Sequence, residues 1–215
     1  MSSINSTSLQ ILTSYMDYVL TNEHVPISVF KFCKDCEIDE TEFYSHFGTL
    51  QHVRKAFWDN ISNRSLEVVQ EDEAYAAYDA HQQLLSFYFT LFENLTLNRS
   101  YVLFMCDGMN DYSFRELKVM RSVIKPVLDG YSHAYKSFVN QLSPELGAKL
   151  NEESLWLQFY MIFKFWMKDG SPGFESTDVF IEKVVKLSAD LSSAMPVDSL
   201  LDFGKFIYKE MKAHL

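Results

Sequence analysis

Residues 38–50 constrain the fold more than any other stretch, because two helix starts stand close together there. Asp39 is followed three residues later by Glu42, which is the spacing of a capping box. Thr49 stands directly before a segment in which apolar residues recur at helical spacing. The stretch therefore predicts a short helix over residues 40–47 between tight turns, followed at once by another helix.

The segments on either side of this stretch complete a small helical cluster. Apolar residues at helical spacing predict a first helix over residues 8–20 and a fourth over 50–69. Between the first helix and the stretch, Ser28 follows a Val-Pro break and is placed to cap a short second helix. The sequence thus predicts three short helices and a long connecting helix.

The rest of the chain also has helical periodicity, and strand-like alternation is scarce. Only 7 Gly and 5 Pro occur in 215 residues, which favours long helices. After Ser143, Gly147 and Asn151 indicate a separate short helix before the next long one. Helices are expected over residues 74–97, 111–142 with a kink or break at Pro126, 152–168, 176–194 and 198–211. We therefore expect an all-α protein.

The charge and the cysteine content of the chain indicate which partners and which cellular compartment to expect. The formal net charge is −10, and each third of the chain holds more acidic than basic residues, so long-range repulsion of polyanions is expected. Three cysteines do not make a disulfide framework, and the first residues lack the pattern of a secretory signal. No apolar run is long enough for a membrane span. These features predict a cytoplasmic protein.

The chain contains few patterns that carry chemistry. Cys33 and Cys36 have the spacing of half a metal or redox site, but no second pair of ligands matches them, so packing of small residues is the favoured interpretation. No metalloprotease motif, nucleophile elbow or glycine-rich phosphate loop is found. We therefore expect neither an enzyme nor a metal or cofactor site.

Aromatic residues in the second part of the chain suggest either an apolar pocket or a well-packed core. Such side chains commonly line small-molecule sites, and the set leaves both interpretations open. Residues 152–168 are apolar on most sides, which predicts burial in the fold or against another chain. The pocket candidates are Phe87, Tyr88, Phe92, Phe104, Tyr131, Tyr135, Trp156, Phe159, Tyr160 and Phe163.

The first 65 residues resemble the helix-turn-helix signature of the TetR family of transcriptional regulators. The residues that carry the resemblance are Ser28, Val29, Phe32, Cys33, Lys34, Ile38, Thr41, the run Phe43-Tyr44-Ser45-His46-Phe47, and 49–53. The resemblance implies an N-terminal helix-turn-helix head (residues 1–50). A long helix (about 50–69) joins this head to a larger helical ligand-binding and dimerisation domain (70–215).

The same resemblance implies a homodimer that binds DNA and an apolar small-molecule effector. It places Tyr44 and His46 at the DNA backbone and Thr41 near the major groove. Lys31, Lys34 and Lys55 are the candidate cations beside them. It also implies that the last long helices, 152–168 and 176–194, hold the dimer together.

The head departs from the family pattern in its charge. Glu37 stands where the family usually has Gly, Glu40 where it usually has Lys, and Glu42 adds a third carboxylate. Because affinity for DNA comes largely from cations that neutralise phosphates, three carboxylates weaken DNA binding. Two hypotheses follow: a TetR-like regulator with a weakened head, or a TetR-fold protein that has lost DNA binding and binds a lipid or other hydrophobic ligand.

Overall fold

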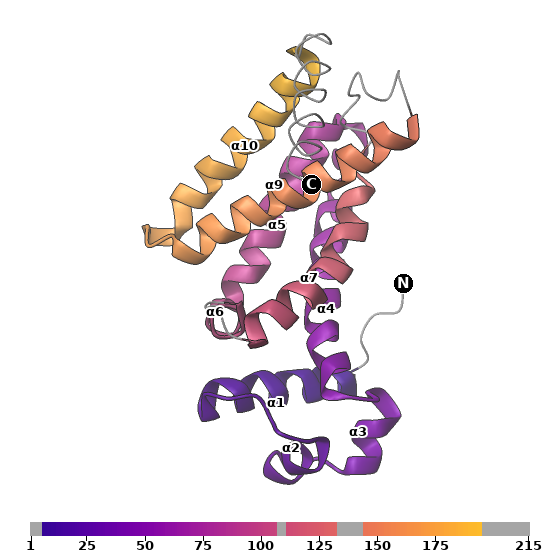
Figure 1. Ribbon diagram of the computed structural model, residues 1–215, viewed down its shortest axis with the longest axis vertical. Coiled ribbons are helices and arrows are strands. Elements are labelled where there is room, and N and C mark those ends of the chain that lie inside the picture. Colours follow the sequence, from indigo (N-terminus) through magenta and orange to yellow (C-terminus); the bar gives the residue numbers. More distant parts are fainter. Residues whose placement is uncertain (1–5, 107–110, 133–143, 195–215) are drawn as a thin grey trace, which may run out of the picture. The chain divides into compact units, whose positions relative to one another are not determined.

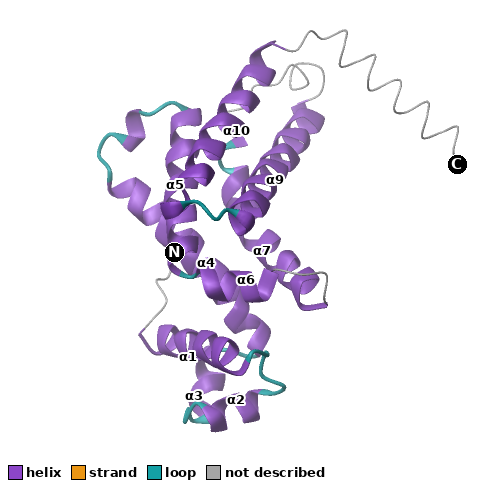
Figure 2. Cartoon of the chain, turned by 90° about the vertical axis from the view of Figure 1, so that its left-hand side faces the viewer, coloured by secondary structure: helices purple, strands orange, loops and turns teal. Residues whose placement is uncertain are grey.

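The computed structural model describes residues 6–106, 111–132 and 144–194, and in these residues all regular structure is helical (Figures 1 and 2). The elements are α1 (Ser6–Asn22), α2 (Val29–Asp35), α3 (Glu40–His46), α4 (Leu50–Glu71), η1 (Tyr75–Ala77), α5 (Ala80–Leu97), α6 (Arg99–Cys106), α7 (Asp111–Asp129), α9 (Pro144–Lys168), η3 (Pro172–Phe174) and α10 (Glu175–Ala194). The all-α prediction is confirmed. Within the described ranges, no helix has the length and hydropathy that a membrane crossing requires.

The chain divides into two compact units. The first comprises Met1–Tyr78 and Ser86–Val127, and the second comprises Asp79–Leu85 and Leu128–Leu215. Most of α5 and nearly all of α7 therefore belong with α1–α4 and α6.

In the first unit, α1 packs against α3, α4 and α6, and α2 packs against α3 (Figure 1). Helices α2, α3 and α4 start where the sequence predicts, because each has a side-chain cap. The Ser28 hydroxyl accepts from the backbone N–H of Lys31, and the Thr49 hydroxyl accepts from that of His52 at 3.2 Å. These caps satisfy N–H groups that a helix start otherwise leaves unpaired.

In the second unit, α9 and α10 form an antiparallel pair joined by a short turn (Figure 2). The Asp169 carboxylate organises the turn by accepting from the backbone N–H and hydroxyl of both Ser171 and Thr177, at 2.6–2.9 Å. Gly173 has φ +63°, a left-handed conformation that glycine adopts without a Cβ penalty. This turn fills the gap between the helices predicted over residues 152–168 and 176–194.

The predicted single helix over residues 74–97 is wrong, because η1 and an extended Tyr78 interrupt it. A reciprocal capping box restarts the chain as α5. The Asp79 carboxylate accepts from the Gln82 N–H at 2.9 Å, and the Gln82 side-chain oxygen accepts from the Asp79 N–H at 3.0 Å. The Asp-x-x-Gln spacing indicates a helix start at this position, but the apolar periodicity of residues 74–97 favoured one continuous helix.

The separate short helix expected after Ser143 is also wrong, because α9 runs without a break from Pro144 to Lys168. Gly147 and Asn151 are both buried in it. An interior glycine costs a helix only about 1 kcal/mol, which tertiary packing overrides. The predicted helix over 198–211, Tyr135, and the part of 111–142 beyond Ser132 lie outside the described residues.

Candidate nucleic-acid interface and ligand domain

An aromatic core holds the three helices of the head together. Phe32 of α2 lies at its centre, with ring centroids 5.7 Å from Tyr15 of α1 and 6.0 Å from Phe43 of α3. All three side chains are fully buried, and Phe47 closes the core at the end of α3. Edge-to-face contacts of this kind add to the gain from burying the rings. Phe43 and Phe47, one helical turn apart at the end of α3, therefore both serve packing.

The turn between α2 and α3 has a left-handed residue at its centre. Glu37 has φ +56°, a conformation that favours glycine and costs other residues about 1–2 kcal/mol. The turn is held by the N–H of Ile38, which donates to the Cys33 carbonyl at 2.9 Å. Asp39 then caps α3 by accepting from the N–H of Glu42 at 3.0 Å. The turn geometry therefore forms despite the absence of glycine.

The outer surface of α3 presents Thr41 and Tyr44 to solvent. Thr41 is exposed, and Tyr44 is 52% exposed, with its ring edge-to-face on buried Phe43. His46 differs, because it is half-buried and its Nδ1 lies 3.1 Å from the Ser8 hydroxyl of α1. Two of the three predicted α3 residues are thus available on the surface, and the third ties α3 to α1.

Two of the three cations predicted to lie beside the DNA are already paired. The Lys31 ammonium donates to the Asp35 carboxylate at 2.6 Å, and the Lys55 ammonium donates to Asp59 at 2.8 Å, both one helical turn away. Lys34 is exposed on α2. Residues 6–50 hold only these two α2 lysines and no arginine, against seven carboxylates. The head surface is therefore acidic.

The cysteines of α2 are not arranged for chemistry. Burial raises the pKa of the Cys33 thiol, and the charges of Glu40 and Asp39 raise it further. Burial also raises the pKa of Cys36, which keeps both thiols protonated and unreactive. Within the part of the chain that the structure describes, no group of three or more His, Cys, Asp or Glu side chains could hold a metal ion.

The predicted pocket residues are mostly buried aromatic side chains. In the first unit, Phe87, Tyr88 and Phe92 are buried on α5, and Phe104 of α6 is exposed at 37%. In the second unit, Tyr131, Trp156, Phe159 and Phe163 are buried, and Tyr160 is half-buried. Along α9, ring centroids lie 5.5 Å apart for Trp156 and Phe159 and 5.8 Å apart for Phe159 and Phe163. Of these residues, the nine that the structure describes are not among the lining residues of either cavity described below.

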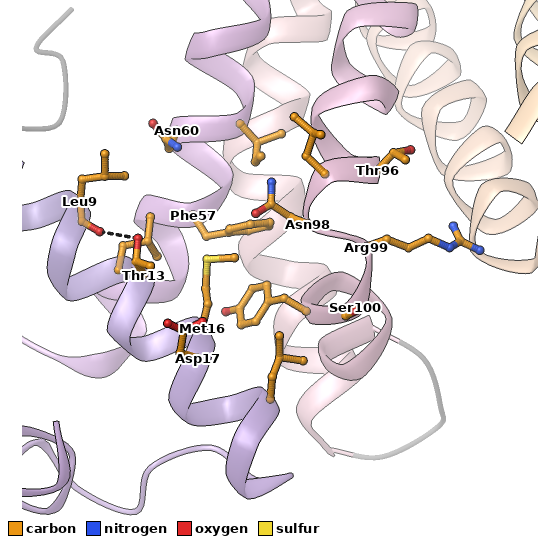
Figure 3. Close-up of a pocket in the computed structure, with 15 residues that line it drawn as sticks. Leu9, Thr13, Met16, Asp17, Phe57, Asn60, Thr96, Asn98, Arg99 and Ser100 are labelled. Carbon is orange, nitrogen blue, oxygen red and sulfur yellow. Dashed lines mark hydrogen bonds between the residues drawn. The ribbon is translucent and has the colours of Figure 1, made fainter. Parts of the chain in front are cut away.

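A cavity of about 460 Å³ lies in the first unit between α1, α4 and the junction of α5 with α6 (Figure 3). Figure 3 shows Met16 and Asp17 on the α1 side, Phe57 on α4, and Asn98 and Arg99 at the junction. Its walls are therefore both apolar and polar, as a site for an amphipathic molecule requires. The sequence did not predict it, because its residues come from three distant segments.

A buried polar cluster joins α4 to α6 and α7 within the same unit. The Trp58 indole N–H donates to the fully buried Glu116 carboxylate at 2.6 Å, and the Arg54 Nε lies 3.8 Å from its other oxygen. Burial raises the pKa of Glu116, while Trp58 and Arg54 oppose that shift. The Tyr101 hydroxyl of α6 is buried without a hydrogen-bond partner, and burial raises its pKa well above the usual value.

Glu116 had a sequence signal that the predictions did not use. On α7 the buried residues Val119, Met120, Val123 and Ile124 recur at helical spacing, and Glu116 occupies the preceding position of that series. A carboxylate in the apolar register of a helix needs a buried partner. Trp58 and Arg54 are those partners.

The α9–α10 pair has one packed face and one exposed apolar face. The Gln158 amide donates to the Ser188 hydroxyl at 2.7 Å, and the rings of Phe165 and Phe180 stack at 4.3 Å. Other large apolar side chains of the pair remain exposed. They are Leu150, Leu157, Met161, Val179 and Leu187, and Phe165 is exposed at 37%.

Comparison with known proteins agrees with this architecture in the larger part of the chain. Residues 83–207 match the family model described as tetracyclin repressor-like, C-terminal domain. No curated protein matches the chain. The matched segment covers more than half of the 215 residues and begins after the head, so it is independent of the helix-turn-helix resemblance. The chain therefore belongs to the TetR family of transcriptional regulators.

Proposed function

We propose that the protein is a one-component transcriptional regulator that binds DNA through α2 and α3 and responds to an apolar small molecule bound in the C-terminal domain. The observation that carries the proposal is the folded three-helix head with Thr41 and Tyr44 on the outer surface of α3. A helix-turn-helix reads DNA with the exposed residues of its second helix, so these side chains would meet the groove and the backbone.

The acidic surface sets the expected strength of that binding. Glu37 and Glu42 are exposed beside α3, and the ammonium groups of Lys31 and Lys55 already have carboxylate partners. Only a few phosphates would be neutralised, so we expect weak binding with a shallow dependence on salt. Lys34 would supply the most accessible positive charge of the two short helices.

The DNA proposal is tested with duplexes from the region upstream of the protein's own gene. Fluorescence anisotropy at low and moderate salt should give saturable binding, and Tyr44→Ala should weaken it by about tenfold, because the variant removes a backbone contact. Glu42→Lys should strengthen it and steepen the salt dependence by about one unit. Leu97→Ala, an exposed substitution at the end of α5 and outside the head, tests whether the loss is specific to Tyr44. Absence of retention at every salt concentration would refute the proposal.

The dimer is part of the same proposal, because two heads are needed to read a two-fold operator. The exposed apolar side chains of α9 lie at positions 150, 157, 161 and 165, which share one helix face. Large exposed apolar patches mark interaction sites, and a second copy would cover this one. Residues 152–168 and 176–194 would then form the core of the interface.

A second candidate function is a hydrophobic-ligand binding module without DNA binding, and the charge of the head favours it. Seven carboxylates against two lysines in residues 6–50 suit no polyanion. The buried rings of α9, Trp156, Phe159 and Phe163, would then contact a lipid-like molecule within the second unit. Native mass spectrometry and solvent extraction of the purified protein should find an apolar molecule near one per chain. If no apolar molecule is recovered and DNA binding is saturable, the result supports the transcriptional regulator over the ligand-binding module.

A further inference from the structure

A second cavity of the first unit has a chemistry that the apolar effector does not explain. It measures about 420 Å³ and lies between the beginning of α4 and the middle of α7. Its described lining residues are Gln51, Arg54, Arg115, Lys118, Val119 and Ser122. Three of the six are cations and none carries a carboxylate, in a chain whose net charge is −10.

We propose that this cavity, named the α4–α7 site, binds a small polyanion such as a phosphorylated or polycarboxylate metabolite. Its volume lies in the usual range for small-molecule sites, which is roughly 300–1,000 Å³. Two positive charges come from α7 and one from α4, so an anion bound there would touch both helices. The described lining residues of this site include none of the aromatic residues proposed for the apolar effector.

The arginine from α4 is held in place for this role. The Arg54 side chain is only 13% exposed, and its Nε lies 3.8 Å from the buried Glu116 carboxylate, beyond hydrogen-bond distance. Glu116 is fixed in turn by the 2.6 Å bond from Trp58. The Arg54 Nε–H is therefore a buried donor without a hydrogen-bond partner. The arginine side chain also lines the cavity. Glu116 balances part of the Arg54 charge but accepts no hydrogen bond from its Nε, so the guanidinium keeps donor capacity for an added anion.

The sequence of α7 concentrates positive charge at the site. Residues 115–125 hold four cations, Arg115, Lys118, Arg121 and Lys125, and one carboxylate, Glu116, which is buried. Arg115, Lys118 and Ser122 share one face of the helix, since they stand at i, i+3 and i+7. The Ser122 hydroxyl donates to the Val119 carbonyl at 2.7 Å, so it is left as an acceptor. Donors to the anion would come from the cations and the Gln51 amide.

An anion bound in the α4–α7 site would stabilise the start of α4, the helix that follows the head. Gln51 and Arg54 lie in the first two turns of α4, directly after the capping residue Thr49. An anion bridging them to Arg115 and Lys118 would add charge-assisted hydrogen bonds between α4 and α7. The free energy of unfolding is therefore expected to rise with the logarithm of one plus the ratio of ligand concentration to its dissociation constant.

The test is isothermal titration calorimetry of the full chain with sodium pyrophosphate and with sodium citrate, at constant ionic strength set with sodium chloride. Saturable binding of either probe is expected, and whichever binds more tightly identifies a phosphate or a carboxylate ligand. The variant Arg115→Gln with Lys118→Gln should weaken binding at least about tenfold, because it removes two charged donors. Both side chains are exposed, so the variant should keep the fold, which circular dichroism checks.

The matched control is Arg121→Gln with Lys125→Gln. It removes the same charge from the same helix at positions that are not among the described lining residues. Its affinity should stay within about twofold of the parent protein. Equal loss in both variants would overturn the site, since it would show general attraction by α7. Absence of heat above the ionic-strength control would also overturn it. The site would be overturned too if duplex DNA bound in a way that depends on Arg115 and Lys118 while neither pyrophosphate nor citrate bound.

Discussion

The head and the α9–α10 pair arrange their apolar residues differently. In the head, Phe32 and Phe43 are fully buried in one aromatic cluster, and the surface holds seven carboxylates along with the exposed apolar residues Ile27 and Phe30. In the α9–α10 pair, Phe159 and Phe163 are buried, but Leu157 is 55% exposed and Val179 and Leu187 are also open to solvent. The head closes its aromatic core within itself, whereas the pair gathers exposed apolar side chains on one face of α9, where a partner could cover them.

Because of this difference, folding and function depend on different residues in the head and on the same residues in the pair. The fold of the head depends on a few buried rings, and its proposed function depends on surface charges that the fold does not constrain. In the pair, the same side chains would serve both assembly and function, because the exposed apolar face is itself the proposed interface. Substitutions should therefore separate folding from function in the head and couple assembly to function in the pair.

The largest effect is expected from removing a ring of the head core. Phe43→Ala should lower the free energy of unfolding by about 3–5 kcal/mol, the cost of deleting a buried phenylalanine and leaving a cavity. Chemical denaturation followed by circular dichroism measures the change. The matched variant is Phe30→Ala on α2, whose ring is 62% exposed and should cost less than about 0.5 kcal/mol. Equal effects of the two would contradict the self-contained core.

The next largest effect tests the exposed face of the pair. Leu157→Glu should raise the dissociation constant of the proposed homodimer at least about 100-fold, because each protomer would bury a carboxylate at the interface. Size-exclusion chromatography with light scattering over a range of concentrations gives this constant. Secondary structure should not change, since the side chain is exposed in the single chain.

The control for this substitution is Leu97→Glu, at the end of α5. Leu97 is 78% exposed and lies outside α9 and α10, so the same chemical change should leave the oligomeric state as it was. A parent protein that is monomeric at every concentration would remove the proposed interface. A dimer that survives Leu157→Glu would place the interface on another surface.

A smaller effect is expected at the turn that joins the pair. Burial alone would raise the pKa of Asp169, but hydrogen bonds from Thr177 and Ser171 outweigh it and hold the pKa at about 2. An unfolded aspartate has a pKa of about 3.9, so the carboxylate stabilises the fold above pH 4. This contribution, about 1 kcal/mol after solvent screening, is lost as the pH falls towards 2.

Unfolding measured between pH 2 and pH 6 checks this linkage. The parent protein should lose more stability than Asp169→Asn on going from pH 4 to pH 2, because only the parent has the carboxylate to protonate. At pH 6 the variant should be the less stable of the two by about 1 kcal/mol. Parallel pH profiles would show that the turn does not depend on this charge.

The sequence predicted the head more completely than the rest because its signals are local. Ser28, Asp39 and Thr49 act as caps within three residues of the N–H groups that they satisfy. Burial of Phe43 and Phe47 follows from their spacing. At the break before α5, the local signal of Asp79 and Gln82 was present, but a long apolar pattern concealed it.

The cavities could not be predicted in the same way, because they depend on contacts between distant segments. Arg54 and Glu116 are separated by 62 positions, and only the packing of α4 on α7 brings them to 3.8 Å. Periodicity states which face of a helix is apolar and leaves open which helix covers it. A buried carboxylate in an apolar register, such as Glu116, indicates that a partner exists but does not identify Trp58.

The smallest effect sharpens the contrast within the head itself, between its fold and its surface. Glu37 adopts φ +56°, so Glu37→Gly should relieve a strained conformation, and the gain should exceed the entropy that glycine loses. The free energy of unfolding should rise by about 0.5–1 kcal/mol. The matched variant Glu37→Gln removes the charge and keeps the strain, so it should leave stability nearly unchanged. If both variants strengthen DNA binding equally while only Glu37→Gly stabilises the head, the charge limits function and the backbone limits folding. If both variants raised the free energy of unfolding equally, the destabilisation by Glu37 would come from its charge and not from its backbone conformation.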